Sequence, residues 1–157
     1  MDRCRIRDLT LLFYCVGILL FIWGNSAVPA DASSADSGNV QAWILSAFPF
    51  LSEIPFLLFL ADRLRKVMHF TEFFLLGIGT VAFFAHRRRF SALRFWLMVL
   101  GGPFVACLDE GIQLFTEGRV ASIIDIGIDA LGYFSCIVLY AVAVFFVRVI
   151  RRKGEVR

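Results

Sequence analysis

Four long apolar stretches alternate with more polar segments along this chain. They lie at about residues 9–24, 67–85, 91–114 and 123–147. At a rise of about 1.5 Å per residue, each helix can cross a hydrocarbon core of about 30 Å, the first only just. A segment surrounded by lipid must pair all its backbone groups internally, so the pattern predicts four transmembrane helices.

The segment between the first two spans has a different pattern. Residues 25–39 are rich in Ser, Ala, Asp and Gly, which predicts an irregular loop. Residues 40–61 are apolar but contain Pro49 and Pro55, which argues against a regular span. We expect two short helices in the membrane interface, the second beginning near Ser52 and Pro55, because serine caps helices and proline fits a first turn.

Composition supports a membrane protein. Hydrophobic residues make up 59% of the 157 residues, and the mean hydropathy is +0.78. A soluble core of this size cannot bury so much apolar surface, whereas lipid solvates it directly. The expected fold is an all-α, polytopic membrane helical bundle. It forms a single domain over residues 1–157, with the interfacial helical segment on the outer face between the first and second spans.

Charge predicts the orientation of the spans. Most of the 16 basic residues lie at one end of them, a distribution that the positive-inside rule assigns to the cytoplasm. They are Arg3, Arg5, Arg7, Arg87, Arg88, Arg89, Arg94, Arg148, Arg151, Arg152, Lys153 and Arg157. Both termini are therefore expected in the cytoplasm. Because the charge is sorted by membrane side, no basic patch for nucleic acid is expected.

The first apolar segment has a second interpretation, as a secretory signal peptide. It has a basic start, and small residues follow it at Ala27 and Ala30. Its apolar stretch is longer than usual for a signal peptide and ends at Trp23, an interfacial anchor. We expect it to be retained as an uncleaved span.

Three polar clusters interrupt the apolar pattern at one end of spans two, three and four. A charge at the centre of a bilayer costs roughly 2.5–3.5 kcal/mol on insertion scales, so these residues require a reason. Counting along the helices from Arg89 and Arg148 places all three clusters at one level near the outer leaflet. The clusters are Lys66, His69 and Glu72; Asp109, Glu110 and Gln113; and Asp125 and Asp129.

Helical spacing brings these residues onto shared faces. Asp109 and Gln113 are four residues apart and share a face. Asp125, Asp129 and Gly132 line one stripe, and Gly132 allows a neighbouring helix to approach closely. We therefore expect an outward-opening polar pocket between spans two, three and four. In the third span, the sequence Gly-Gly-Pro at 101–103 is expected to kink or loosen the helix.

Basic residues at the same end depart from the positive-inside pattern. Arg63, Arg65 and Lys66 precede the second span, and Arg119 lies in the short connection at 115–122. These residues suit a phosphate or carboxylate, and Arg119 can pair with a carboxylate of the clusters. The alternative is a solvated helix end that contacts lipid headgroups.

The clusters allow more than one chemistry. His69 beside Glu72 can act as a general base, or the pair can form a hydrogen bond between helices. The aspartates and glutamate of the other two clusters can bind a divalent cation, hold a protonated acid, or be neutralised in a structural network. Nine polar residues at one depth exceed what one helix contact requires, which favours a functional pocket. The ligand-binding candidates are Lys66, His69, Glu72, Asp109, Glu110, Gln113, Arg119, Asp125 and Asp129, and the catalytic candidates are His69, Glu72, Asp109 and Glu110.

Known sequence motifs do not decide between these chemistries. The sequence has no nucleophile elbow, P-loop or zinc-protease helix, and no Cys–His spacing that suggests zinc. We therefore assign neither a metal nor a cofactor from the sequence.

The clusters resemble the motifs of VanZ-like membrane proteins. Residues 66–77 are similar to the segment K-x-x-H-F-x-E-Y/F-x-x-L-G of that family. Residues 109–132 resemble its segment D-E-x-x-Q-x-F…G-R…D-x-x-x-N/D-x-x-G. The likeness runs in order over roughly residues 20–140, and it departs at Asp129, where the family often has Asn.

The resemblance implies a small multi-pass protein of the bacterial cytoplasmic (inner) membrane with a cell-envelope role. The family is named after a member linked to low-level resistance to the glycopeptide teicoplanin, so a link to antibiotic resistance is one expectation. It implies no defined reaction.

Three functions remain open, in order of preference. In the first, the pocket binds a membrane lipid, a lipid-linked envelope precursor or a glycopeptide-type ligand. In the second, a hydrolase or transferase acts on a lipid-linked envelope substrate, using His69 with Asp109 or Glu110. In the third, the polar set only fastens the bundle, and partners bind through residues 26–62. A transporter is weaker, because four spans leave little room unless the protein forms an oligomer.

Overall fold

The computed structural model describes residues 3–85 and 91–155, and every regular element in these ranges is a helix. The elements are α1 (Arg3–Ser26), α2 (Ala30–Ala47), the short 3-10 helix η1 (Pro49–Glu53), α3 (Pro55–Asp62), α4 (Leu64–Ala85), α5 (Ala92–Gln113) and α6 (Ile123–Glu155). Helices α1, α4, α5 and α6 are long and apolar enough to cross a membrane, which confirms the all-α, multi-pass prediction. The basic residues Arg87, Arg88, Arg89 and Arg157 lie outside the described ranges.

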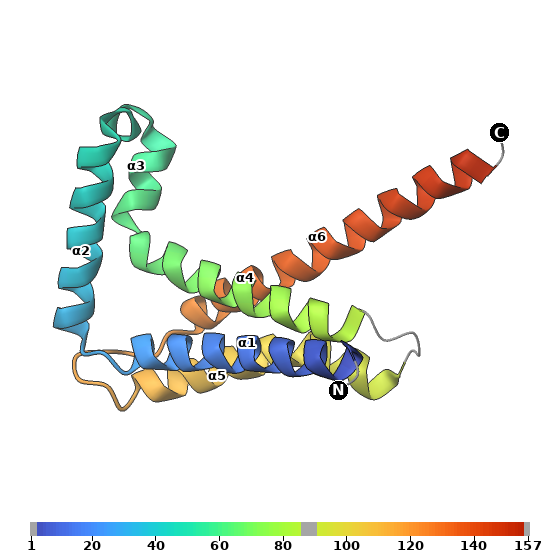
Figure 1. Cartoon of the computed structure of the whole chain (residues 1–157). Coiled ribbons are helices and arrows are strands. Elements are labelled where there is room, and N and C mark those ends of the chain that lie inside the picture. The colour runs from blue at the N-terminus through green and yellow to red at the C-terminus, as the bar shows by residue number, and fades with distance from the viewer. Residues whose placement is uncertain (1–2, 86–90, 156–157) are drawn as a thin grey trace.

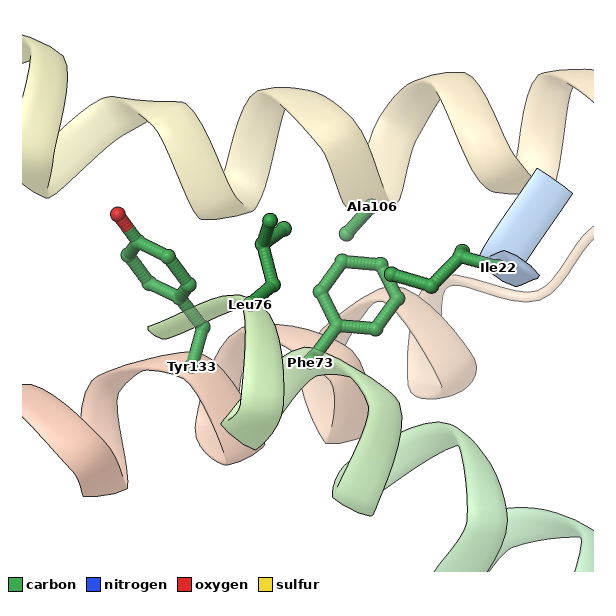
Figure 2. Packing of buried hydrophobic residues seen from close by; sticks show 5 residues of the cluster. All are labelled: Ile22, Phe73, Leu76, Ala106 and Tyr133. Carbon is green, nitrogen blue, oxygen red and sulfur yellow. The ribbon is translucent and has the colours of Figure 1, made fainter. Parts of the chain in front are cut away.

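The four long helices pack around one small apolar core (Figure 1). Its members are Ile22 of α1, Phe73 and Leu76 of α4, Ala106 of α5 and Tyr133 of α6, all buried (Figure 2). Each long helix therefore contributes to a single core, while its outward face remains apolar and exposed, as contact with lipid requires.

Glycines allow α6 to pack closely against α4 and α5. A Cβ on Gly132 would lie 2.3 Å from the carbonyl oxygen of Phe70 in α4, so the predicted close approach at Gly132 is confirmed. A Cβ on Gly102 would lie 2.3 Å from the ring of Tyr133. Helix α5 continues through Pro103 as one helix, and Gly102 serves there as the surface on which Tyr133 packs.

The Tyr133 side chain also ties α6 to α5 by a hydrogen bond. Its hydroxyl donates to the carbonyl oxygen of Met98 at 2.6 Å.

The segment between α1 and α4 differs from its prediction. The irregular loop predicted for residues 25–39 is wrong, because α2 begins at Ala30 and continues to Ala47. Alanine is the strongest helix former, and four alanines in residues 30–42 outweigh the Ser, Asp and Gly around them. No residue of α2 is buried.

The two prolines begin helices, as predicted for Pro55. Pro49 starts η1 and Pro55 starts α3. The predicted cap at Ser52 is wrong, because Ser52 lies within η1 and its hydroxyl donates to the Pro49 carbonyl at 2.7 Å. Helices α2 and α3 are joined through η1 and turn away from the direction of α1 (Figure 1), as an interfacial hairpin would.

Candidate functional site

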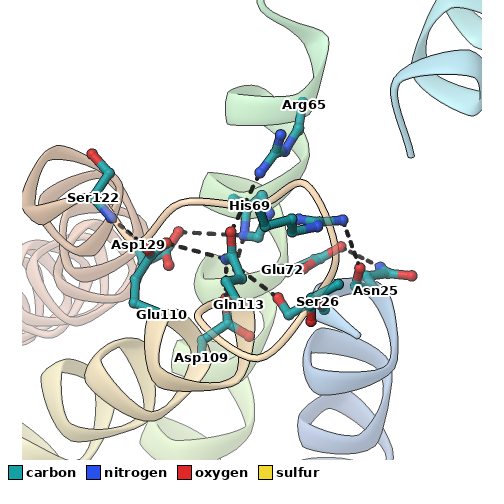
Figure 3. Close-up of polar contacts among 12 residues, drawn as sticks. Asn25, Ser26, Arg65, His69, Glu72, Asp109, Glu110, Gln113, Ser122 and Asp129 are labelled. Carbon is teal, nitrogen blue, oxygen red and sulfur yellow. Dashed lines mark hydrogen bonds and ion pairs between the residues drawn. The ribbon is translucent and has the colours of Figure 1, made fainter. Parts of the chain in front are cut away.

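The polar clusters meet where the ends of four helices come together. The C-terminal ends of α1 and α5 and the N-terminal ends of α4 and α6 all lie there (Figure 3). This confirms the predicted convergence of the three clusters on one level. The arrangement follows from the alternating direction of the spans, because the clusters border the N-terminal end of α4, the C-terminal end of α5 and the N-terminal end of α6.

His69 lies between two buried carboxylates. Its Nδ1 is 3.8 Å from Asp109 Oδ2 in α5 and 3.7 Å from Asp129 Oδ1 in α6 (Figure 3). Both aspartates are completely buried. One turn earlier on α4, Lys66 Nζ contacts Asp125 Oδ1 at 2.6 Å. Helices α4 and α6 are therefore joined by two pairs of charged or ionisable groups, next to the close contact at Gly132.

Gln113 connects the other members of the second cluster. Its Nε2 donates to Asp109 Oδ2 at 3.0 Å and to Glu110 Oε1 at 3.1 Å. Its Oε1 accepts from Arg65 Nη2 at 3.3 Å. Glu110 Oε2 also accepts from the backbone N–H of Ser122 at 2.7 Å, so both of its oxygens are held.

Glu72 is bound by the first span rather than by its neighbour on α4. Asn25 Nδ2 donates to Glu72 Oε1 at 2.7 Å. The sequence suggested a pair between His69 and Glu72, but the hydrogen bond of Glu72 links α4 to α1. Ser26, adjacent to Asn25, is completely buried and accepts from Gln113 at 3.5 Å. The end of α1 is therefore part of the site.

Arg119 binds backbone carbonyls. Its Nε donates to the Val28 carbonyl at 2.8 Å and its Nη2 to the Asn25 carbonyl at 2.9 Å. The structure thus places its hydrogen bonds on the α1–α2 turn and not on the carboxylates suggested by the sequence. Burial, followed by the charge of Arg65, lowers the pKa of Arg119, while nearby carboxylates act in the opposite direction. An arginine remains protonated at neutral pH all the same.

A cavity of about 380 Å³ opens beside these groups, and we call it the main pocket. Its basic wall contains Arg63, Arg65 and Lys66, and its other walls include residues of α2, α4, α5 and α6. The α2 residues are Ser34, Ser37, Gly38 and Gln41; the others are His69, Glu110, Gln113, Asp125 and Asp129. A smaller cavity of about 130 Å³ adjoins it, and Arg65 and His69 line both.

All nine predicted site residues lie in this network, whereas several contributors were missed. Asn25, Ser26 and Ser122 were missed because their partners are far apart in sequence. The α2 wall was missed with the helix itself, although polar residues at 34, 37 and 41 have the spacing of one helical face.

One known family matches most of the chain. Residues 11–146 match the family model described as VanZ/LLP1, a range that includes all three polar clusters. No curated protein and no solved structure matches the chain.

Proposed function

The chain belongs to the VanZ/LLP1 family, as its motifs indicated, and on that premise we propose that it binds the anionic headgroup of a membrane lipid or lipid-linked envelope precursor in the main pocket. We place the pocket at the outer leaflet of a bacterial cytoplasmic membrane, with both termini in the cytoplasm. Arg148 and Arg151 support this orientation, because they lie near the opposite end of α6 from the pocket.

The observation that carries the proposal is the position of Arg65. Its guanidinium lies at the boundary of both cavities and donates to Gln113, a neutral amide. Among the described residues, no carboxylate lies within ion-pair distance of Arg65. A planar guanidinium with N–H groups still to satisfy suits a phosphate or carboxylate of a ligand.

The other two basic residues have different roles. Arg63 is exposed, and its guanidinium lies 4.6 Å from the centre of the Phe59 ring, which holds it at the mouth of the pocket. Lys66 is paired with Asp125, which already neutralises its charge, so we expect Lys66 to contribute less to the binding of an anion. Arg65 is therefore the residue whose loss should weaken binding most.

Binding of a short-chain lipid by the purified full-length protein tests the proposal. Dioctanoyl phosphatidic acid should raise the thermal unfolding temperature, whereas dioctanoylglycerol, which lacks the phosphate, should not. Arg65→Ala should weaken binding about tenfold, equal to about 1.4 kcal/mol. Arg148→Ala is the matched control, because it removes the same charge from an exposed position far from the pocket.

Two results would count against headgroup recognition. Equal binding of the neutral diacylglycerol would show that only the acyl chains are recognised. Equal effects of Arg65→Ala and Arg148→Ala would show a general effect of net charge. Mass spectrometry of lipids that copurify with the wild type and with Arg65→Ala would then identify the natural ligand class.

A hydrolase or transferase acting on a lipid-linked substrate is a second candidate, favoured by the position of His69. The imidazole lines both cavities and faces Asp109 and Asp129, so it can reach a bound substrate. Glu110 is less suitable as an acid, because both of its oxygens already accept hydrogen bonds. An unchanged cellular phenotype of His69→Gln would exclude this version.

We also propose an envelope role that includes teicoplanin-type resistance. Deleting the gene from its own host should increase susceptibility to teicoplanin. Restoring the wild-type gene should reverse the change, and restoring Arg65→Ala should not. Unchanged susceptibility after deletion would separate this member from the resistance role for which the family is named.

A further inference from the structure

We propose that His69, Asp109 and Asp129 bind a divalent transition-metal ion of the Mn²⁺ or Zn²⁺ class beside the main pocket. Each residue offers one ligand atom, and the three atoms lie within 4.8 Å of one another. They come from α4, α5 and α6, and Figure 3 shows the three residues in one polar cluster. The proposal does not depend on headgroup binding.

Unsatisfied buried atoms are the second observation that points to an ion. Asp129 is completely buried, yet neither of its carboxylate oxygens has a hydrogen-bond partner among the described residues. In the same part of the chain, Asp109 Oδ1 and His69 Nδ1 are also buried and have no such partner. An ionised carboxylate buried without compensation is strongly unfavourable, and a bound cation supplies that compensation.

Protein cations do not supply the missing charge. Within the described ranges, His69 is the only basic side chain within ion-pair distance of Asp109 or Asp129. Lys66 pairs with Asp125, and Arg119 donates to backbone carbonyls. When both aspartates are ionised, a single imidazole between them leaves negative charge uncompensated even when the imidazole is protonated.

The distances suit coordination better than hydrogen bonding. The separations of 3.7 and 3.8 Å from His69 Nδ1 exceed a hydrogen bond. Ligand atoms about 2.1 Å from one metal are on the order of 3.0–3.4 Å apart, so the two separations from His69 would each have to shorten by roughly half an ångström when the ion binds. The ion would draw α4, α5 and α6 together.

The surroundings also fit a metal site. Gln113 donates to Asp109 Oδ2 and thereby fixes the orientation of that carboxylate, as outer groups do around bound metals. His69 and Asp129 both line the main pocket, so further coordination positions would face the pocket and accept water or a ligand oxygen. An imidazole in the set favours a transition metal over Ca²⁺ or Mg²⁺.

Manganese titration of the full-length protein in detergent, after removal of metals with EDTA, tests the proposal. Electron paramagnetic resonance of free Mn²⁺ should show one bound ion per chain. Asp129→Asn and Asp109→Asn should each weaken binding at least tenfold. Asp125→Asn is the matched control, because it removes a carboxylate from the pocket wall without removing a proposed ligand.

Spin-echo spectroscopy of the wild-type complex identifies the ligand directly. Bound Mn²⁺ should show coupling to an imidazole ¹⁴N, and His69→Gln should abolish it. Bound Mn²⁺ without ¹⁴N coupling, no stoichiometric binding, or equal losses in Asp125→Asn and Asp129→Asn would each overturn the proposal. The wild-type measurement tests the metal proposal even if a variant does not fold. Phosphatidic acid binding repeated in EDTA tests the headgroup proposal separately.

Discussion

Replacing Gly132 with alanine tests whether the site depends on close contact between α4 and α6. The added Cβ would lie 2.3 Å from the Phe70 carbonyl oxygen and 3.1 Å from its Cα. These are backbone atoms, so no side chain can rotate out of the way. To restore ordinary contact, α4 and α6 would have to separate locally by roughly 1 Å.

The expected loss combines two opposing terms. Overpacking of a tight contact costs typically 1–3 kcal/mol, and a rigid backbone contact belongs at the upper end of that range. Alanine is about 0.8–1.0 kcal/mol more favourable than glycine inside a helix, which offsets part of the cost. We expect Gly132→Ala to be less stable than the wild type by about 1–2 kcal/mol.

Gly127 provides a control on the same helix. Nothing lies within 4 Å of a Cβ added there, so Gly127→Ala should gain about 0.5–1 kcal/mol. Thermal unfolding of both variants in one detergent should give midpoints on opposite sides of the wild type, separated by about 4–10 °C. Equal midpoints would refute the close contact. The separation of α4 from α6 should also lower manganese affinity, because His69 and Asp129 lie on the two helices.

Three further substitutions test individual contacts. In the presence of EDTA, Asp109→Asn should be as stable as the wild type or more stable, because the substitution removes a buried charge. A loss of about 3–5 kcal/mol in the free energy of unfolding would instead identify Asp109 as a structural partner of His69. Tyr133→Phe should lose about 1 kcal/mol in thermal unfolding with its hydrogen bond to Met98, and an unchanged midpoint would contradict that bond. Arg119→Lys should lose about 1–3 kcal/mol, because one ammonium cannot reproduce the guanidinium fork, and limited proteolysis should cut the 115–122 connection faster. Unchanged proteolysis would show that Arg119 does not hold that connection.

The sequence predicts features that depend on local physics. The cost of exposing backbone groups to lipid fixes the four spans, and their alternation brings the polar clusters to one end. Helical spacing places Gly132 on the stripe that faces α4. Each of these inferences needs only the neighbouring residues or a count along one helix.

Other features depend on partners that leave no local signal. The carbonyls bound by Arg119 belong to the backbone, which has the same chemistry at every residue. The bond from Asn25 to Glu72 spans 47 residues. The set of His69, Asp109 and Asp129 comes from three helices and matches no ligand spacing within one segment. Helix α2 was missed because polar residues around its alanines looked like a loop.

The contacts of α1 with later parts of the chain determine the order in which the protein can mature. Ile22 completes the core, Asn25 holds Glu72, and the turn after Ser26 receives Arg119 from beyond α5. The polar atoms at the end of α1 therefore gain their partners only when α4, α5 and Arg119 are in place. A protease that removed the segment up to Ala30 would take a wall of the site with it. The end of α1 thus contributes both to the apolar core and to the hydrogen bonds of the site.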